Sequence, residues 1–383
     1  MDFSLTPADL RFQQEVREFL DREATPEMVA EHDRLKSIHG PEARKLMKKL
    51  GARGWLTPTW PKKWGGLDGT NIQKLIVFDE LGCRGLHSTF IAAQMAGPIL
   101  MMFGSQELQQ EFLPGISQGE IEFSLGYTEP QAGSDMASLD IRAVEDGDYY
   151  VINGQKMFST FTHCAEYHWL GVRTSTEGPK HRGISLMLVD LKNPGITVRP
   201  LIVMDGERTN EVFYDNVRVP KKYMVGQKNH GMSQILAAVD LERMFPTGYL
   251  FRMFDKFLEF SRAAVRDGQP FKNDPLVRQK TAQIATELDI VRLLSYYCAW
   301  AVDLGRPVTK EASTLKLFLS ELHKKIGLLG LETMGMYSQL SEHAHIGGEL
   351  SNFYLWGIRR TIAAGSSEIQ RNVIATRGLG LPR

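Results

Sequence analysis

Residues 149–160, YYVINGQKMFST, begin the part of the chain that decides its fold. Strand-forming residues stand on both sides of the dipeptide Asn153-Gly154. A type I′ turn needs positive φ at both central residues, and Asn-Gly adopts this most readily, so the pattern predicts a β-hairpin. More strand-like runs, separated by turn residues, follow at 183–190, 196–203 and 211–219. We therefore expect a β domain of roughly a hundred residues in the middle of the chain.

The sequence on both sides of this region has helical periodicity. Before it, Thr6 and Ser105 stand where N-caps are expected, and Pro7 suits a first helical position. After it, an apolar-periodic stretch over 232–266 is expected to be interrupted near Pro246. Later helix starts are expected at Asp274–Pro275, at Thr309 as a cap, and at a capping box of Ser367 with Gln370.

The order of these segments predicts an α+β fold with helices at both ends. The expected domains are a helical domain, a β domain and a helical bundle, over residues 1–120, 121–225 and 226–383. At roughly 150 residues per domain, a chain of 383 residues holds two or three domains.

Composition and charge narrow the class of protein. Forty-five basic and 45 acidic residues give zero formal charge, which excludes a general polyanion binder, so no nucleic-acid partner is expected. With 43% hydrophobic and 23% charged residues, the chain is typical of a soluble globular protein. Three cysteines, far apart and odd in number, argue against a disulfide framework and a zinc ribbon and favour the cytoplasm. The first residues carry no basic-then-apolar run, so no signal peptide is expected.

Three local patterns could suggest a membrane span, a metal site or a nucleic-acid contact, and each has a simpler interpretation. The 22 uncharged positions between Arg84 and Glu107 could span a membrane, but Gly, Pro, His and Gln interrupt them. We interpret this segment as a pair of buried helices and expect no membrane partner. His343 and His345 are two residues apart and would not share a ligand on a helix, so no metal site is expected. Arg359-Arg360 is interpreted as a solvated pair.

No phosphate loop, dinucleotide-binding glycine motif or nucleophile elbow occurs in the sequence. Three segments remain as candidates: 123–135 (FSLGYTEPQAGSD), 153–160 (NGQKMFST) and 364–372 (AGSSEIQRN). The first is a loop whose backbone could approach a ligand. The second would place Phe158 and Thr160 on one side of a strand, either as an ordinary sheet face or as a ligand surface. The third is a glycine turn into a capped helix, whose amides suit an anion or a developing oxyanion.

Taken together and in this order, these segments resemble the acyl-CoA dehydrogenase family. The resemblance covers nearly the whole chain and rests on WPKKWGG at 60–66, the TEP-AGSD loop, INGQKMFST at 152–160 and SSEIQRNVIA at 366–375. It implies an N-terminal helical domain, a middle β domain and a C-terminal four-helix bundle, which agrees with the independent α–β–α order.

The resemblance also implies FAD between the β domain and the C-terminal helices, with an acyl-CoA thioester against the flavin. The residues implied to bind the cofactor are Leu125, Tyr127, Thr128, Gly133, Ser134, Phe158, Thr160, Phe271, Ser366 and Glu368. Phe158 replaces a usual tryptophan, so the apolar face stays and the indole donor is lost. Glu368 stands where the family usually has Gln, and its carboxylate is unfavourable beside the negative charge of FAD.

The reaction of the family removes a proton from C2 of the thioester and a hydride from C3, the hydride going to flavin N5. The usual base is a Glu in the terminal motif, and Ala364 occupies that position here. A subgroup that includes isovaleryl-CoA dehydrogenase has its base in an Asp-Leu-Glu-Arg pattern instead, which this chain carries at 240–243. The resemblance therefore implies that Glu242 is the base. The alternative is an ordinary helix carboxylate that reaches solvent or pairs with Arg243.

The surroundings expected for Glu242 support the first of these roles. Its neighbours at i ± 3 and i ± 4 are Ala238, Val239, Phe245 and Pro246, all apolar. Such a stripe removes water from a carboxylate and raises its pKa, which suits a general base near neutral pH.

The resemblance implies further contacts to the substrate. The implied substrate-binding residues are Ser134, Asp240, Arg243 and Ala363. Asp240 and Arg243 would contact the pantetheine arm, or form an i, i+3 salt bridge instead. The backbone N–H of Ala364 would hold the thioester oxygen as an oxyanion donor, because alanine keeps this group. The two small residues 363–364 also open space, which predicts a branched, cyclic or otherwise bulky acyl group.

Departures from the family pattern concern assembly. The family usually offers one stretch to the FAD pyrophosphate of a neighbouring subunit, and here that stretch, 266–273, keeps Phe271 but has Gly268 at the position of an Arg. LETMGM at 331–336 also differs from the usual Gln-rich segment. We therefore expect either a heterotetramer with a homologous subunit or a homotetramer with altered FAD contacts. Electron-transfer flavoprotein is the implied acceptor. A catalytically silent partner subunit and an oxidase-like flavoenzyme are the alternatives.

Overall fold

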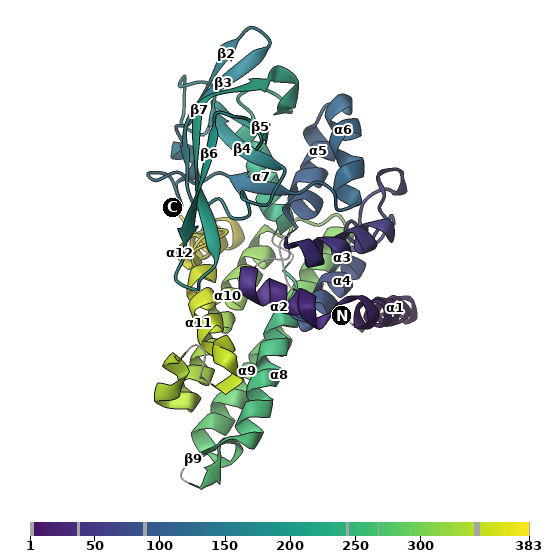
Figure 1. The fold of residues 1–383 in the computed structure, drawn as a ribbon, viewed down its shortest axis with the longest axis vertical. Coiled ribbons are helices and arrows are strands. Elements are labelled where there is room, and N and C mark those ends of the chain that lie inside the picture. The colour runs from purple at the N-terminus through teal and green to yellow at the C-terminus, as the bar shows by residue number, and fades with distance from the viewer. Residues whose placement is uncertain are drawn as a thin grey trace.

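The computed structural model shows three groups of elements in chain order: helices, a β-sheet, then helices (Figure 1). The predicted α+β architecture is therefore confirmed. The structure describes residues 4–36, 39–86, 90–242, 245–266, 268–340 and 345–382, without the side chains of 239–242, 345 and 347.

The N-terminal helices begin largely where the sequence predicts. Their bounds are α1 Pro7–Glu23, α2 Pro26–Leu35, α3 Pro41–Ala52, α4 Asn71–Cys83, α5 Gly97–Phe103 and α6 Gln106–Ser117, with η1 Lys62–Trp64 and the π-helical turn η2 Ala92–Ala96. Thr6 and Ser105 are confirmed as N-caps, since their side chains accept from Asp9 N and Leu108 N. The segment predicted as two buried helices instead forms one helical run in its described part, because η2 continues into α5.

The middle of the chain is one eight-stranded sheet in the order β6-β7-β3-β2-β4-β5-β8, with β1 paired parallel to β4. The strands are β1 Phe123–Gly126, β2 Arg142–Asp146, β3 Tyr149–Lys156, β4 Tyr167–Arg173, β5 Ile184–Asp190, β6 Ile196–Ile202, β7 Arg208–Pro220 and β8 Met224–Val225, with η3 Met136–Ser138 and η4 Lys221–Tyr223. The strands predicted at 183–190, 196–203 and 211–219 are confirmed.

The predicted hairpin at Asn153-Gly154 is wrong. Both residues lie inside β3, and the register with β7 shifts between Ile152 and Gly154. The turn falls earlier, where Gly147 has φ 57° between β2 and β3. Pairing with β7 over a long sequence separation therefore outweighs the local preference of Asn-Gly for a turn. Residues 157–160 follow the strand and are not part of it.

The C-terminal helices form the predicted four-helix bundle from α8, α9, α10 and α11, which pack around α10. The bounds are α7 Gly231–Glu242, α8 Gly248–Ala263, β9 Val265–Arg266, β10 Gln269–Pro270, η5 Phe271–Asn273, α9 Pro275–Asp303, α10 Thr309–Met334, η6 Gly335–Gln339, η7 His345–Gly348, α11 Glu349–Arg360, α12 Ser367–Val373 and the π-helical η8 Ile374–Gly378. The break near Pro246 and the Asp274 cap are confirmed.

Two predicted caps lie one residue away from their expected positions. Thr309 is the first residue of α10, and Val308 precedes it as the cap. Ser366 rather than Ser367 caps α12, because its hydroxyl accepts from Ile369 N. Gln370 does not complete a capping box and turns back to the preceding loop, as described below.

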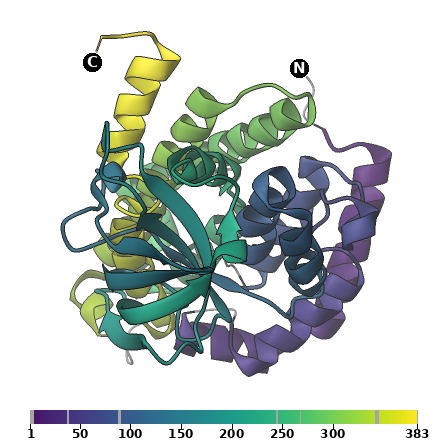
Figure 2. The same cartoon turned by 90° about the horizontal axis from the view of Figure 1, so that it is seen from above.

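Two apolar cores support the arrangement. One joins the N-terminal helices to the sheet and includes Ile235 and Ala238 of α7, and the other fills the bundle. Seen from above, the N-terminal helices curve around one side of the sheet, and α12 projects from the opposite side (Figure 2). Within the described ranges, no helix combines the length and apolar character needed to cross a bilayer. The three cysteines are unpaired, and burial raises the pKa of each thiol to about 12.

Candidate functional site

A buried ion pair fixes the loop after β1. Lys156 at the end of β3 is completely buried, and its Nζ donates to Glu129 Oε1 at 2.8 Å and to the Tyr127 carbonyl at 3.1 Å. The Glu129 carboxylate also accepts from the backbone of Asp140 at 2.7 Å and Ile141 at 3.1 Å. Burial alone would raise the pKa of Glu129, but Lys156 and these amides hold it below its ordinary value. The pair thereby ties the TEP loop to the sheet.

The sequence reasoning missed Glu129 and Lys156, although both belong to the quoted motifs. A buried carboxylate or ammonium is costly without a partner of opposite charge. One acidic and one basic residue in two adjoining motifs could therefore have suggested an ion pair between them.

Residues 157–160 form a tight turn beside this loop. Met157 N donates to the Thr128 carbonyl at 2.9 Å, and Thr160 N donates to the Phe158 carbonyl at 3.0 Å. Phe158 has φ 55°, and its side chain is 52% exposed. The expectation of one strand face carrying Phe158 and Thr160 is therefore wrong, because the backbone reverses between them. The turn instead presents an open aromatic ring next to the TEP loop.

The other predicted cofactor residues of the β domain lie around this turn. Leu125 and Thr128 are half-buried, Tyr127 is buried, and Gly133 and Ser134 are exposed. The hydroxyl of Thr160 donates to Thr209 Oγ1 at 3.3 Å, which places it at the start of β7. The structure therefore brings Tyr127, Thr128, Phe158 and Thr160 together, which were separate in the sequence.

The loop between α11 and α12 holds an unusual backbone. Ala364 has φ 54° and Gly365 φ 83°, both in the left-handed region. The buried Gln370 side chain donates to the carbonyls of Ala364 at 3.1 Å and Gly365 at 3.3 Å. No acceptor among the described residues takes the Ala364 N–H. Ala363 beside it is exposed. The loop thus has its carbonyls fixed and one amide hydrogen available to a ligand.

Arg359 connects this loop to the sheet. Its guanidinium donates to Asp205 Oδ2 at 2.9 Å and pairs with Glu207, both buried in the turn before β7. Burial raises the pKa of Glu207 to about 7, against the opposing effect of Arg359. The prediction of a solvated arginine pair is therefore wrong for Arg359, because it anchors α11 to the β domain beside Thr209.

The predicted base lies at the end of α7. Glu242 is the last residue of this helix, and its side chain and those of Asp240 and Arg243 lie outside the described residues. The helix packs against β5, η2 and α5. It ends at Glu242, so the predicted apolar stripe holds only on its N-terminal side, where Ala238 is 0% exposed. Phe245 follows the break in the helix and packs in the core of the bundle instead.

A carboxylate from the N-terminal domain fixes the start of α8, a few residues after Glu242. Asp79 on α4 accepts from Thr247 N and, at 2.9 Å, from Gly248 N, at the start of α8. Burial raises the pKa of Asp79 to about 6, although these amides oppose the rise. A Cβ at Gly248 would lie 2.1 Å from the Asp79 carbonyl oxygen, so only glycine permits this approach.

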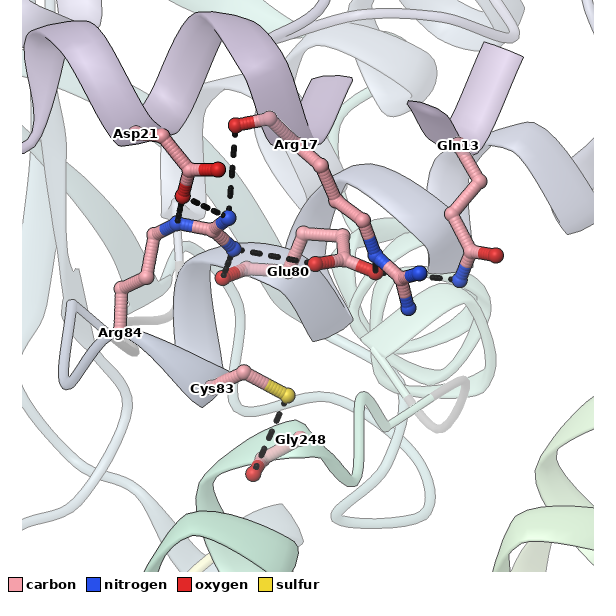
Figure 3. A network of polar contacts seen from close by, with 7 residues as sticks. All are labelled: Gln13, Arg17, Asp21, Glu80, Cys83, Arg84 and Gly248. Atoms are coloured by element: carbon pink, nitrogen blue, oxygen red, sulfur yellow. Dashed lines mark hydrogen bonds and ion pairs between the residues drawn. The ribbon is translucent and has the colours of Figure 1, made fainter. Parts of the chain in front are cut away.

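An ionic network holds α4 in place for that contact (Figure 3). The buried Glu80 accepts from Gln13 at 3.0 Å and Arg17 at 2.7 Å on α1, and from Arg84 at 3.0 Å. On the opposite face, Cys83 Sγ lies 3.7 Å from the Gly248 carbonyl oxygen. The helix that positions the α7–α8 break is therefore itself fixed by α1.

Phe271 does not join the other predicted cofactor residues. It directly follows β10, which pairs with β9 at the end of the bundle away from the sheet (Figure 1). Its ring is 7% exposed, packs against Phe260 at 5.7 Å and lies under the Arg266 guanidinium at 4.6 Å. Phe271 belongs to the stretch expected to face the FAD of a neighbouring subunit, and that contact stays a prediction.

The residues near the β domain fit FAD, which the resemblance implies. Phe158 offers an open ring face to a flat heterocycle, and a Cβ at Gly133 would meet no atom within 4 Å, so the loop has room beside its backbone. The residues at the start of α12 fit FAD less well, because Glu368 adds a negative charge there. The Glu368 side chain is 75% exposed there, and its charge is offset by Arg371 at 3.6 Å.

Three family models match the chain in sequence order. They describe the acyl-CoA dehydrogenase N-terminal domain over 6–120, the middle domain over 124–217 and the C-terminal domain over 229–379. The chain is 34% identical to acyl-CoA dehydrogenase FadE29 of Mycobacterium tuberculosis, in a match covering 100% of this chain and 99% of that protein.

Solved structures with the same fold agree with these matches. The steroid ACAD Tcur3481-Tcur3483 superposes with a TM-score of 0.91 at 32% identity, covering 100% of both chains. The ChsE4-ChsE5 complex from Mycobacterium tuberculosis gives 0.90 at 30% identity, with the same coverage. The chain therefore belongs to the acyl-CoA dehydrogenase family and is an FAD-dependent oxidoreductase.

Proposed function

We propose that this protein dehydrogenates an acyl-CoA thioester between C2 and C3, and that Glu242 abstracts the C2 proton. The observation that carries the proposal is the position of Glu242 at the end of α7, one turn after the buried Ala238, while Ala364 leaves the terminal loop without a carboxylate. FAD, when bound, supplies the acceptor for the hydride from C3.

The other proposed site residues bind and orient the substrate and the cofactor. The unpaired N–H of Ala364 stabilises the negative charge that develops on the thioester oxygen. Phe158 and Thr160 would hold the flavin ring. The rest of the cofactor would be held by Leu125, Tyr127, Thr128, Gly133, Ser134, Ser366 and Glu368. Asp240, Arg243, Ser134 and Ala363 contact the acyl-CoA.

The acyl group is proposed to be branched, cyclic or otherwise bulky. Ala363 and Ala364 leave space beside the reacting carbon, and a related structure at 32% identity is that of a steroid ACAD. A panel of acyl-CoA thioesters tests this. Bulky or ring-containing groups should give the highest kcat/KM, and a maximum for straight chains would overturn the proposal.

The base is tested by Glu242→Gln in the holoprotein. The variant should keep its FAD, because the amide occupies nearly the same volume, but acyl-CoA should no longer bleach the flavin absorbance. Glu259→Gln on α8 is the matched control, since this residue is exposed, and should bleach at the rate of the original chain. Undiminished bleaching in Glu242→Gln would show that another group takes the proton.

We propose that the FAD site is completed by a homologous subunit in a heterotetramer. Gly268 stands where family members usually offer an arginine to a neighbour, and LETMGM at 331–336 departs from the usual Gln-rich segment, so both departures fall on the half-site offered to a neighbour. The chain purified alone should therefore bind little FAD. One FAD per chain in a homotetramer would refute this proposal. It would favour a homotetramer in which other residues replace the usual contacts to FAD.

The acceptor is proposed to be an electron-transfer flavoprotein, and the compartment a reducing cytoplasm. Anaerobic dye reduction compared with peroxide formation separates this from an oxidase-like enzyme. A second candidate, a catalytically silent subunit, is favoured by Ala364 alone. It predicts that Glu242→Gln leaves the activity of the assembled complex unchanged.

A further inference from the structure

A separate cavity of about 190 Å³ lies in the N-terminal domain, away from the residues assigned to FAD and acyl-CoA. It is partly open to solvent and is lined by the loop before η1, the start of α4, the η2–α5 helix and the end of α9. Its polar lining consists of Thr57, Thr59, Asn71, Lys74 and Gln94.

Lys74 is the unusual member of this lining. It is 8% exposed, and no hydrogen bond or ion pair joins its ammonium to any described residue. Burial lowers its pKa to about 8. The two other buried lysines each have acceptors, since Lys156 binds Glu129 and Lys316 donates to the Arg360 carbonyl at 3.0 Å. With no acceptor among the described residues, the Lys74 ammonium has the cavity that it lines as the place from which a partner can come.

The carboxylate at this end of α9 does not serve as that partner. Asp303 accepts from Asn71, through the backbone N at 2.9 Å and the side-chain Nδ2 at 2.7 Å. The polar lining side chains besides Lys74 are hydroxyls and amides, which can donate to oxygen atoms. Trp60, Pro98 and Met101 supply apolar walls.

We propose that this cavity binds a small carboxylate, with its oxygens at the Lys74 ammonium and its alkyl part against Trp60. The volume admits a short acid and excludes a CoA thioester. A carboxylate supplies both the negative charge that Lys74 lacks and an apolar part that the walls accept. The π-helical turn η2, which lines the cavity, also contacts α7 on the way to Glu242.

Calorimetric titration of this full-length chain, purified alone, with butyrate at constant ionic strength set by chloride tests the proposal. One butyrate should bind per chain and raise Tm. Lys74→Met and Lys74→Gln should each weaken binding at least tenfold, and the exposed control Lys192→Met should bind as the original chain does.

If both Lys74 variants fail to fold, the titration of the original chain with butyrate still tests the proposal. Absence of saturable heat with butyrate would overturn the proposal. So would a change of less than twofold in a folded Lys74 variant. Inorganic phosphate is the second probe, and binding of phosphate without butyrate would refute the carboxylate assignment.

Discussion

At the scale of single residues, Ala364 combines a strained backbone with an available amide hydrogen. A left-handed conformation costs an alanine about 1–2 kcal/mol, whereas glycine adopts it freely. With φ 54° at Ala364, the variant Ala364→Gly should raise the unfolding free energy by about 0.5–1 kcal/mol. Ala363→Gly is the control, because its φ is negative, and should lower stability by a similar amount. Denaturant melts of the two variants check this, and equal shifts would contradict it.

At the scale of elements, Asp79 holds the junction of α7 and α8. Asp79→Asn keeps an oxygen for the amides of Thr247 and Gly248, whereas Asp79→Ala loses the cap at a cost of about 1 kcal/mol. Proper placement of Glu242 depends on this junction, so the alanine variant should have the lower kcat. Equal kcat values for the two Asp79 variants would show that the α7–α8 junction does not affect catalysis.

The same carboxyl predicts a pH dependence. Its folded pKa of about 6 exceeds the ordinary 3.8, so the folded protein binds the proton more tightly than the unfolded chain. Its contribution to stability is therefore present below about pH 4 and is lost as pH rises to about 6, by about 3 kcal/mol. Thermal melts from pH 4 to 7 should fall less steeply for Asp79→Asn than for the original chain. Parallel profiles would contradict the assignment.

The strand β3 and the TEP loop depend on one buried pair. Lys156→Met leaves Glu129 charged and buried, which should cost about 3–5 kcal/mol and reduce FAD content. The double variant Lys156→Met with Glu129→Gln should recover much of that stability, because no uncompensated charge remains. Absorbance at the flavin band and thermal melts check both. A double variant less stable than the single one would contradict this explanation.

At the scale of the whole molecule, Arg359 joins the bundle to the sheet. Arg359→Ala leaves the buried Asp205 and Glu207 side by side without their closest cation, which should destabilise the interface by about 3–5 kcal/mol. Arg371→Ala is the control, since its pair with Glu368 is exposed and worth under about 1 kcal/mol. Thermal melts of the two variants test the difference, and similar shifts would refute a clamping role.

What the sequence predicts well in this protein is local. The caps at Thr6, Ser105 and Asp274, and the break before Pro246, depend on a few neighbouring residues and are where they were expected. The Asn153-Gly154 hairpin fails because β7 pairs across that dipeptide from a distant part of the chain. The candidate site divides in the same way, into motifs that a local pattern identifies and contacts that only the fold creates.

Contacts between segments far apart in the sequence could not be predicted from local pattern. Asp79 and Thr247 are 168 residues apart, and Lys156 and Glu129 are 27 apart. Each pair forms only because the helices and strands that carry them pack together. The motifs therefore named the segments of the site, while the groups that hold those segments in place emerged from the fold.

Burial raises the pKa of Cys83, Cys164 and Cys298 to about 12, which keeps these thiols protonated near neutral pH and slows their reaction with alkylating reagents. Cys83 is exposed, so it is replaced by serine before any labelling. A single cysteine introduced at the exposed Lys192 then reacts first with a fluorescent maleimide. A dye at this position would follow assembly with a partner subunit without occupying the residues assigned to FAD and acyl-CoA.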